Sequence, residues 1–391
     1  MNRISYPLAS TTWDEREIET AIEVIKGGRY TMGPRVREFE ERFADYFGSK
    51  YAVMASSGSA ANLLAVAAQT FKSENPLRPG DEVIVPAVSW GTTYYPLHQY
   101  GLKLKFVDID PDTLNLDVNL LEGAIGPRTR GIFAVNLLGC PNDFGPLIEF
   151  CRRHDLLLLE DNCESMGARY ARKYAGTFGV CGTFSTFFSH HICTMEGGVV
   201  LTDDEELYQI MVSLRAHGWT RELPDENHVH DKNGNPFDDM FRFVLPGYNL
   251  RPLEISGAVG VCQLEKLAEL VEERRKNAET FVGLFGDKDY VRIQTPVGES
   301  SWFAFALTLH GPLAGRRDEV VGRLMEAGVE CRPIVAGNFT KNPVIRYLDC
   351  EMHGDLPNAN RIDRDGFFIG NHHYDLSDEL AAVRRSIEGC I

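Results

Sequence analysis

The chain has 391 residues, of which 43% are hydrophobic and 25% charged, as in soluble globular proteins with a sizeable core. Acidic residues outnumber basic ones by 56 to 40, so the formal net charge is −16. A surface of this sign repels nucleic-acid phosphates and anionic lipids, so we predict neither a nucleic-acid nor a membrane partner.

The cysteine pattern and the N-terminus predict a cytoplasmic protein. The nine cysteines are scattered and form no CxxC or CxC pair, which argues against a metal cluster and against a disulfide scaffold. The first fifteen residues hold no apolar signal core. No stretch approaches the roughly 18 uninterrupted apolar residues of a membrane span. We therefore expect reduced thiols and no metal.

Apolar periodicity predicts two helices and then an alternation of strands and helices. The helices, over residues 16–28 and 36–48, carry isoleucines and phenylalanines at helical spacing. The isoleucines are Ile18, Ile22 and Ile25, and the phenylalanines are Phe39, Phe43 and Phe47. Strand-like runs follow at residues 51–57, 82–86, 104–110, 131–135, 156–161, 183–188 and 198–203. Buried runs that alternate with helices predict an α/β fold with a mostly parallel sheet.

The character of the chain changes in its second half. Residues 221–240 are polar and rich in turn formers, which predicts a surface loop. A long helical pattern covers residues 255–285, and the remainder mixes strands and helices. We therefore predict an N-terminal arm and a large domain over residues 1–254, and a smaller C-terminal α+β domain over 255–391.

Two strand ends carry residues suited to a charged ligand, because ligands of parallel α/β sheets bind beyond the carboxyl ends of the strands. The segment SSGSAAN, residues 56–62, lies between a strand and a helix. It predicts a phosphate cradle or a tight turn, and the segment alone supports both equally. Asp161 follows four leucines and would be buried. Its partner would be a cationic ring or a nearby arginine, and spacing alone slightly favours the arginine.

Two further strand ends carry aromatic residues and histidines. Trp90 would stack on a planar ring, although packing is the commoner role of a lone tryptophan. The last segment reads FFSHHICTMEGG and contains His190 and His191. Adjacent residues of an extended segment point to opposite sides, so this pair would chelate a metal poorly. One histidine would serve as a base, although a structural role is commoner.

Taken together, these segments resemble the sugar aminotransferase (DegT/DnrJ/EryC1/StrS) family of fold-type I pyridoxal-phosphate enzymes. The matching motifs, in chain order, are TMGPRVREFEERFA, SSGSAANLLA, VIVPAVSW, FVDIDPDTLNLD, LLEDNCESMGA, FSTFF with EGG, RAHGW and GYNLRPLEISGAVG. The resemblance covers nearly the whole chain. It implies an aspartate aminotransferase-like fold and a pyridoxal 5'-phosphate or pyridoxamine 5'-phosphate cofactor.

The chain departs from this family at one position. Most members have a lysine six residues before the Glu of EGG, which binds the cofactor covalently. Counting back six from Glu196 gives His190. An imidazole forms no stable Schiff base, but it transfers protons near neutral pH. The resemblance therefore implies a cofactor held without a covalent bond.

Members without the lysine resemble 3-dehydratases, and the chain lacks the CxC pattern of their iron–sulfur branch. The resemblance implies a lyase that removes the C3 hydroxyl of a nucleotide-linked 4-keto-6-deoxy sugar, with GDP-4-keto-6-deoxy-D-mannose as the expected substrate. L-Glutamate would regenerate pyridoxamine phosphate. The implied pathway is deoxysugar biosynthesis, such as that of colitose in lipopolysaccharide O-antigen. The alternatives are an aminotransferase on a nucleotide 4-keto-sugar and a non-catalytic sugar-nucleotide-binding relative.

The resemblance also implies roles for individual residues, with His190 as the proton-transfer group. Cofactor positions are Gly58, Ser59 and Ser185 for the phosphate, Trp90 for the ring face, Asp161 for the pyridinium nitrogen, and Glu164 near the ring hydroxyl, where many relatives have Gln. Asn249 matches a residue that reaches the phosphate from the neighbouring subunit, which implies a homodimer with shared active sites. Arg251 and Arg332 are candidates for contacts with the substrate or the glutamate carboxylate, and a structural ion pair explains each equally well.

Overall fold

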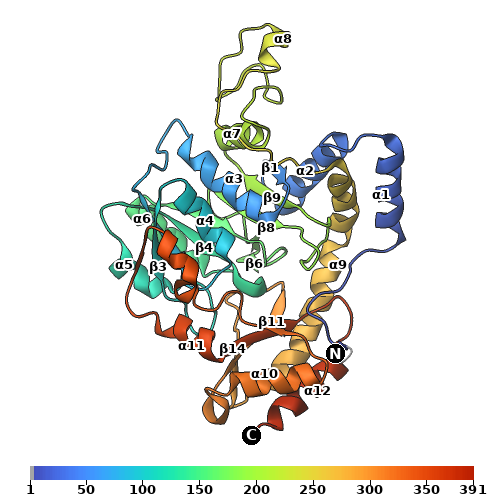
Figure 1. Ribbon diagram of the computed structural model, residues 1–391, viewed down its shortest axis with the longest axis vertical. Coiled ribbons are helices and arrows are strands. Elements are labelled where there is room, and N and C mark those ends of the chain that lie inside the picture. Colours follow the sequence, from blue (N-terminus) through green and yellow to red (C-terminus); the bar gives the residue numbers. More distant parts are fainter. Residues whose placement is uncertain (1–3) are drawn as a thin grey trace.

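An eight-stranded sheet runs through the larger part of the molecule in the computed structural model, which describes residues 4–391 (Figure 1). The strand order is β1-β9-β8-β5-β4-β2-β3-β13. Every pair from β8 to β13 is parallel, and only β9 runs antiparallel to its neighbours. The strands are β1 Tyr51–Ala55, β2 Glu82–Pro86, β3 Lys103–Val107, β4 Thr129–Val135, β5 Leu157–Asp161, β8 Cys181–Ser185, β9 Gly198–Thr202 and β13 Cys350–Met352. The predicted mostly parallel α/β sheet is confirmed.

Helices cover both faces of this sheet because successive strand residues point to opposite sides. On β2, Val83 and Val85 pack into the cluster formed with α3, α4 and α7, whereas Ile84 packs against α5 and α6. Near β1, α2 and the first half of α9 complete the second layer. These helices are α2 Pro34–Phe47, α3 Gly58–Thr70, α4 Gly91–Gln99, α5 Leu121–Ala124, α6 Phe144–His154, α7 Glu205–Arg215 and α9 Glu254–Phe285.

A smaller antiparallel sheet of order β10-β11-β14-β12 lies at the other end of α9. Its core joins the end of α9 to α10 and α12. The elements are β10 Val291–Ile293, β11 Ala304–Leu309, β12 Cys331–Arg332, β14 Gly366–Gly370, α10 Arg317–Glu326, α11 Pro357–Asp365 and α12 Ser377–Glu388. The remaining short elements are β6 Arg169–Tyr170, β7 Lys173–Tyr174, α8 Pro236–Asp239 and five 3₁₀ turns at Val118–Leu120, Leu137–Gly139, Gly311–Leu313, Phe339–Lys341 and Pro343–Tyr347.

The strand β13 comes from the C-terminal half but lies at the edge of the large sheet, beside β3. Its Glu351 forms ion pairs with Lys103 and Lys105 of β3. Lys105 is buried and also pairs with Glu82 of β2 at 3.0 Å. The division of the chain at residue 254 stays a prediction. The strand β13 follows residue 254 in the chain but belongs to the sheet formed by strands that precede it.

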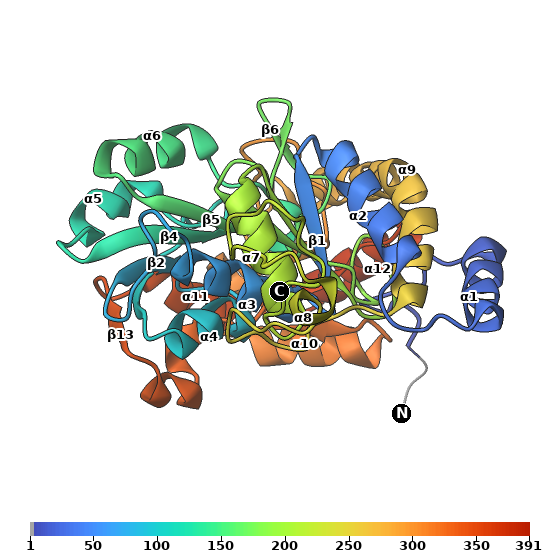
Figure 2. The ribbon, with the colours of Figure 1, turned by 90° about the horizontal axis from the view of Figure 1, so that it is seen from above.

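Helix α1 (Glu15–Gly27) turns its apolar stripe away from the chain. Ile18, Ile22 and Ile25 are 44%, 43% and 56% exposed. The buried side instead carries Glu17, whose carboxylate pairs with Lys266 of α9 at 2.7 Å. Figure 2 shows α1 standing beyond α9 at the side of the molecule. The periodicity predicted the helix correctly, but its isoleucines belong to no core of this chain.

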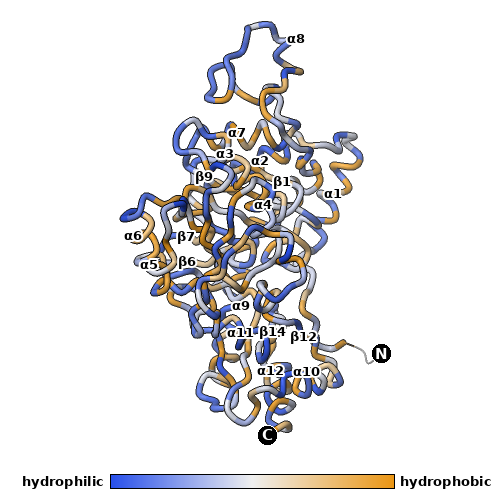
Figure 3. Tube along the Cα trace, turned by 60° about the vertical axis from the view of Figure 1, so that its left-hand side comes forward, coloured by the Kyte–Doolittle hydropathy of each residue, from blue (hydrophilic) through white to orange (hydrophobic). Residues whose placement is uncertain are grey.

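The polar segment over residues 221–240 forms a projection that carries α8 (Figure 1). In Figure 3 this projection is mostly hydrophilic, with apolar patches near α8. No helix within residues 4–391 is long and apolar enough to cross a membrane.

The crossing of α2 and α9 generates a stability prediction. A Cβ added at Gly257 of α9 would lie 2.6 Å from the Val36 backbone of α2. Gly257→Ala should therefore lower the free energy of unfolding by about 1–3 kcal/mol, measured in urea. Gly283→Ala in the same helix is the control, because a Cβ there meets nothing within 4 Å. Equal stabilities for the two variants would contradict this account.

Candidate active site

The carboxylate of Asp161 is buried at the end of β5 and has only uncharged partners. It accepts hydrogen bonds from Asn62 Nδ2 at 2.8 Å, from Thr93 Oγ1 at 2.7 Å and from the Cys163 N–H at 3.1 Å. Within residues 4–391 it forms no ion pair, so the arginine that spacing favoured is not its partner. A buried charge without a counter-ion is costly. This carboxylate therefore fits a cationic ring nitrogen.

Asn62 and Thr93 lie near the starts of two helices that follow strands of the sheet. Asn62 lies on α3, which follows β1 in the chain, and Thr93 lies on α4, which follows β2. Asn62 is buried, and its Oδ1 accepts from Thr183 Oγ1 on β8 at 2.5 Å. Neither residue was predicted from the sequence as a partner of Asp161. The available signal was Asn62 itself, an amide next to the apolar run of α3.

Gly58, Ser59 and Ser185 come together at the N-terminus of α3. A Cβ at Gly58 would lie 2.6 Å from the Ser185 Cβ and 3.1 Å from the Cys163 Sγ, so only glycine fits there. The Ser59 Oγ donates to Thr92 Oγ1 of α4 at 2.9 Å. The first N–H groups of a helix have no intrahelical partner and attract anions. The tight turn is present, and the phosphate cradle stays a prediction that this packing is compatible with.

Trp90 immediately precedes α4 and is 60% exposed. Burial in the core of this chain is therefore not its role. It shares the start of α4 with Thr92 and Thr93, which contact Ser59 and Asp161. An exposed indole at this edge has a face free for a planar ring.

His190 lies in an irregular segment that follows β8. The strand ends at Ser185, so the predicted strand over 183–188 was too long, and the chain turns from Phe188 onward. The His190 Nδ1 lies 2.7 Å from the Cys163 carbonyl oxygen. A carbonyl only accepts, so Nδ1 carries the proton and Nε2 keeps its lone pair. Burial lowers the pKa of His190 to about 4, so the ring is neutral at pH 7.

His191 is fully buried and faces a different partner, the Ser301 carbonyl, at 3.2 Å from Nε2. The segment is not extended, so the expected strand-like alternation of the two side chains does not apply. Distinct carbonyl partners separate the two rings instead, and both rings pack near Phe303. A structural role for His191 stays a prediction, and its burial and its contact with the Ser301 carbonyl are compatible with it.

Glu164 ends the turn that begins at Asp161. Its Oε2 accepts from the N–H of Leu138, a residue held in the left-handed region at φ 51°. Burial, together with the nearby Asp161 carboxylate, raises the pKa of Glu164 to about 7, although the Leu138 N–H opposes the shift. A carboxyl that holds a proton for part of the time near neutral pH can lie beside a phenolate without full repulsion.

The remaining predicted residues lie at the periphery. Asn249 is exposed and accepts from Arg251 Nε at 3.0 Å. The next residue, Leu250, accepts from the Ser56 N–H through its carbonyl, so this turn lies beside the end of β1. Arg332 lies on β12 of the smaller sheet, is 65% exposed, and pairs with Glu330 at 3.7 Å. No contact joins Arg332 to the other predicted site residues.

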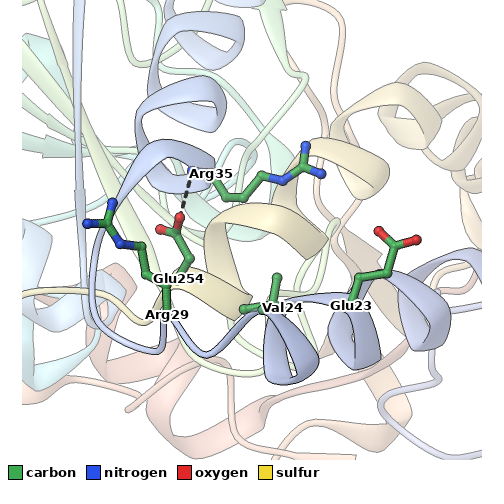
Figure 4. Close-up of a pocket in the computed structure, with 6 residues that line it drawn as sticks. Glu23, Val24, Arg29, Arg35 and Glu254 are labelled. Atoms are coloured by element: carbon green, nitrogen blue, oxygen red, sulfur yellow. Dashed lines mark hydrogen bonds between the residues drawn. The ribbon is translucent and has the colours of Figure 1, made fainter.

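A separate hollow of about 150 Å³ lies between α1, α2 and the start of α9 (Figure 4). In it, Glu254 accepts from the Arg35 N–H at 2.9 Å, and Arg29 extends beside the same carboxylate. None of its lining residues belongs to the predicted site.

The sequence and the fold of the chain are similar to those of one protein family. The family model described as "DegT/DnrJ/EryC1/StrS aminotransferase family" matches residues 11–388 of the chain. The chain is 55% identical over 379 residues to GDP-4-keto-6-deoxy-D-mannose 3-dehydratase of Yersinia pseudotuberculosis, with 96% of each chain covered. The structure of the E. coli enzyme of that name with bound hydrated PLP has a TM-score of 0.97 and 52% identity, and the match covers 99% of this chain and 100% of that one.

Two further structures of this enzyme each share 52% identity and a TM-score of 0.96, with 98% of this chain and 100% of the other covered. One holds a trapped PLP-glutamate geminal diamine. The other is a histidine-to-asparagine variant with bound GDP-perosamine.

The depressed pKa of His190 predicts a change of stability with pH. The unfolded imidazole protonates below its ordinary pKa of 6.5, whereas the folded one stays neutral down to about pH 4. The unfolded chain thus binds more protons in this window, and the free energy of unfolding should fall as pH drops from 6.5 to 4. His190→Asn should flatten that dependence in urea titrations at stepped pH. Equal slopes for the variant and the wild type would contradict the neutral state of the folded ring.

Proposed function

We propose that this chain, which belongs to the DegT/DnrJ/EryC1/StrS aminotransferase family, removes the C3 hydroxyl of GDP-4-keto-6-deoxy-D-mannose as a pyridoxamine-phosphate-dependent 3-dehydratase. In the overall reaction the sugar loses its C3 oxygen and keeps its C4 ketone. L-Glutamate supplies the two electrons and leaves as 2-oxoglutarate and ammonia. The observation that carries the proposal is His190, a neutral imidazole in the position of the family's lysine.

The residues present fit the cofactor. Asp161 would hold the protonated ring nitrogen, because its buried carboxylate lacks a cation. Gly58, Ser59 and Ser185 would hold the phosphate at the start of α3, where a Cβ would fill the space. Trp90 would cover one ring face. When bound, the cofactor supplies the electron sink that lets the C3–oxygen bond break.

His190 performs the proton transfers in this proposal. The Cys163 carbonyl fixes Nδ1 as the protonated nitrogen and directs the lone pair of Nε2 away from Cys163. Nε2 accepts a proton during the reaction and returns it to the departing C3 hydroxyl as a general acid. The imidazole cannot make the covalent bond to the cofactor that a lysine would make. The site therefore favours release of ammonia over transfer of an amino group to the sugar.

We also propose a homodimer with shared active sites. The chain continues from the outward isoleucines of α1 to Tyr30, which is also exposed. The Tyr30 carbonyl accepts from the Glu254 N–H, and Thr31 pairs with the exposed Leu253 in a β-bridge. Asn249 and Arg251 lie a few residues before Leu253. A second copy that covers this apolar face would bring its own Asn249 close to a phosphate cradle. Arg251 then becomes a substrate-contact candidate, whereas Arg332 keeps its surface pair with Glu330.

The function is tested with purified protein, pyridoxal phosphate, L-glutamate and GDP-4-keto-6-deoxymannose. We expect ammonia and a 3-deoxy-4-keto sugar in equal amounts, identified by mass spectrometry. His190→Asn should lower kcat by about 100-fold or more, the usual contribution of a general acid–base. An amino sugar in place of ammonia would show an aminotransferase. Failure to bind the cofactor would show a non-catalytic relative.

The homodimer is tested by sedimentation. The double variant Ile18→Asp, Ile22→Asp should shift the protein from dimer to monomer, because it places charges on the apolar face. Ile148→Asp is the control, since Ile148 is an isolated exposed residue of α6. Mixing inactive His190→Asn with inactive Asn249→Ala should restore activity through mixed dimers in which one site is intact. A wild-type monomer, or no recovery on mixing, would reject shared sites.

A further inference from the structure

The segment that carries His190 has no helix or strand of its own. This histidine loop, residues 186–197, joins β8 to β9 and is built of turns and bends. Its backbone is held at Cys193, three residues beyond His190. The Cys193 N–H donates to Gln263 Oε1 at 3.0 Å, and the Cys193 carbonyl accepts from Trp13 Nε1 at 2.9 Å. Two side chains from distant parts of the chain thus fix both peptide groups of one loop residue.

Gln263 lies on α9, is fully buried, and uses all of its hydrogen-bonding capacity. Besides Cys193, its Oε1 accepts from Thr12 Oγ1 at 2.5 Å. Its Nε2 donates to the Thr12 carbonyl at 3.1 Å and to Glu17 Oε1 at 2.8 Å. Each donor meets an acceptor, so the orientation of the amide is determined.

Trp13 and Thr12 belong to the N-terminal arm, residues 4–14, which crosses the smaller sheet and α9 before α1 begins (Figure 1). At its far end the Tyr6 hydroxyl donates to the Gly370 carbonyl at 2.6 Å. The Pro7 carbonyl lies 2.9 Å from His372 Nε2. Asp14 then caps α1, and its Oδ2 accepts a hydrogen bond from Lys266 Nζ at 2.6 Å. The arm is anchored on both sides of the Trp13 contact.

We propose that Trp13 and Gln263 are positioning residues for His190, and that only the end of the arm next to α1, at Trp13, serves catalysis in this way. This inference rests on the proposed role of His190. Proton transfer requires the base to be held within a fraction of an ångström of its productive position. Irregular loops open more readily than strands or helices unless they are held by contacts such as these. The hydrogen bonds from Gln263 and Trp13 to Cys193 restrain the loop, while the Cys163 carbonyl orients the His190 ring.

The test compares two hydrogen-bond deletions within the same arm. Trp13→Phe removes the bond to the Cys193 carbonyl, and Tyr6→Phe removes the bond to the Gly370 carbonyl at the far end. Trp13→Phe should lower kcat about tenfold at unchanged KM, the equivalent of one buried hydrogen bond. Tyr6→Phe should leave kcat unchanged, even if it lowers the melting temperature as much.

Hydrogen–deuterium exchange of the cofactor-free protein gives a readout independent of activity. Peptides spanning the histidine loop should exchange faster in Trp13→Phe and at the wild-type rate in Tyr6→Phe. Gln263→Glu is the second variant, because its carboxylate would face Glu17 and the Thr12 carbonyl and should accelerate the same exchange.

The outcomes separate this inference from the proposed function. Unchanged loop exchange in both Trp13→Phe and Gln263→Glu would overturn the positioning role. Equal loss of kcat in Trp13→Phe and Tyr6→Phe would reduce the arm to a general stabiliser and also overturn it. If the wild type shows no dehydratase activity, the proposed function fails, and the exchange data alone decide whether the arm holds the loop.

Discussion

The arrangement of the site depends on one buried negative charge, the carboxylate of Asp161. It lies at the carboxyl end of a central strand, where it is buried and an unpaired charge is costly. The protein meets this cost with neutral donors from α3 and α4, which hydrogen-bond the carboxylate without placing a counter-charge beside it. The starts of both helices must therefore converge on β5. The same convergence brings the proposed phosphate-binding start of α3 and Trp90 to this edge of the sheet.

The turn over residues 161–164 carries three of the proposed functions. Its first residue carries the carboxylate, its third supplies a carbonyl that fixes the tautomer of His190, and its fourth carries Glu164. A change in the direction of this turn would alter all three functions together.

Sequence patterns predicted the sheet, whereas the family resemblance implied the proposed site residues. Apolar runs such as those of β2 and β5 predict strands that are covered on both faces. Spacing alone favoured an arginine beside Asp161, and the roles of Asp161 and His190 came from the resemblance. Asn62, Thr93, Trp13 and Gln263 were missed because their partners are 30 to 250 residues away, and hydrogen bonds across such separations leave no local pattern. The isoleucine stripe of α1 identified a helix but not its orientation, because periodicity marks an apolar face without indicating what covers it.

The strand β13 affects how the polypeptide can be divided. The chain leaves the large sheet after β9, builds most of the smaller sheet, returns to place β13 beside β3, and only then completes the smaller sheet with β14. A fragment ending before α9 would lack β13 and would leave β3 as a bare edge with Lys105 deprived of Glu351. Exposed edges of this kind recruit other strands and lead to aggregation. The two sheets therefore form one cooperative unit in which the C-terminal half protects the N-terminal half from self-association.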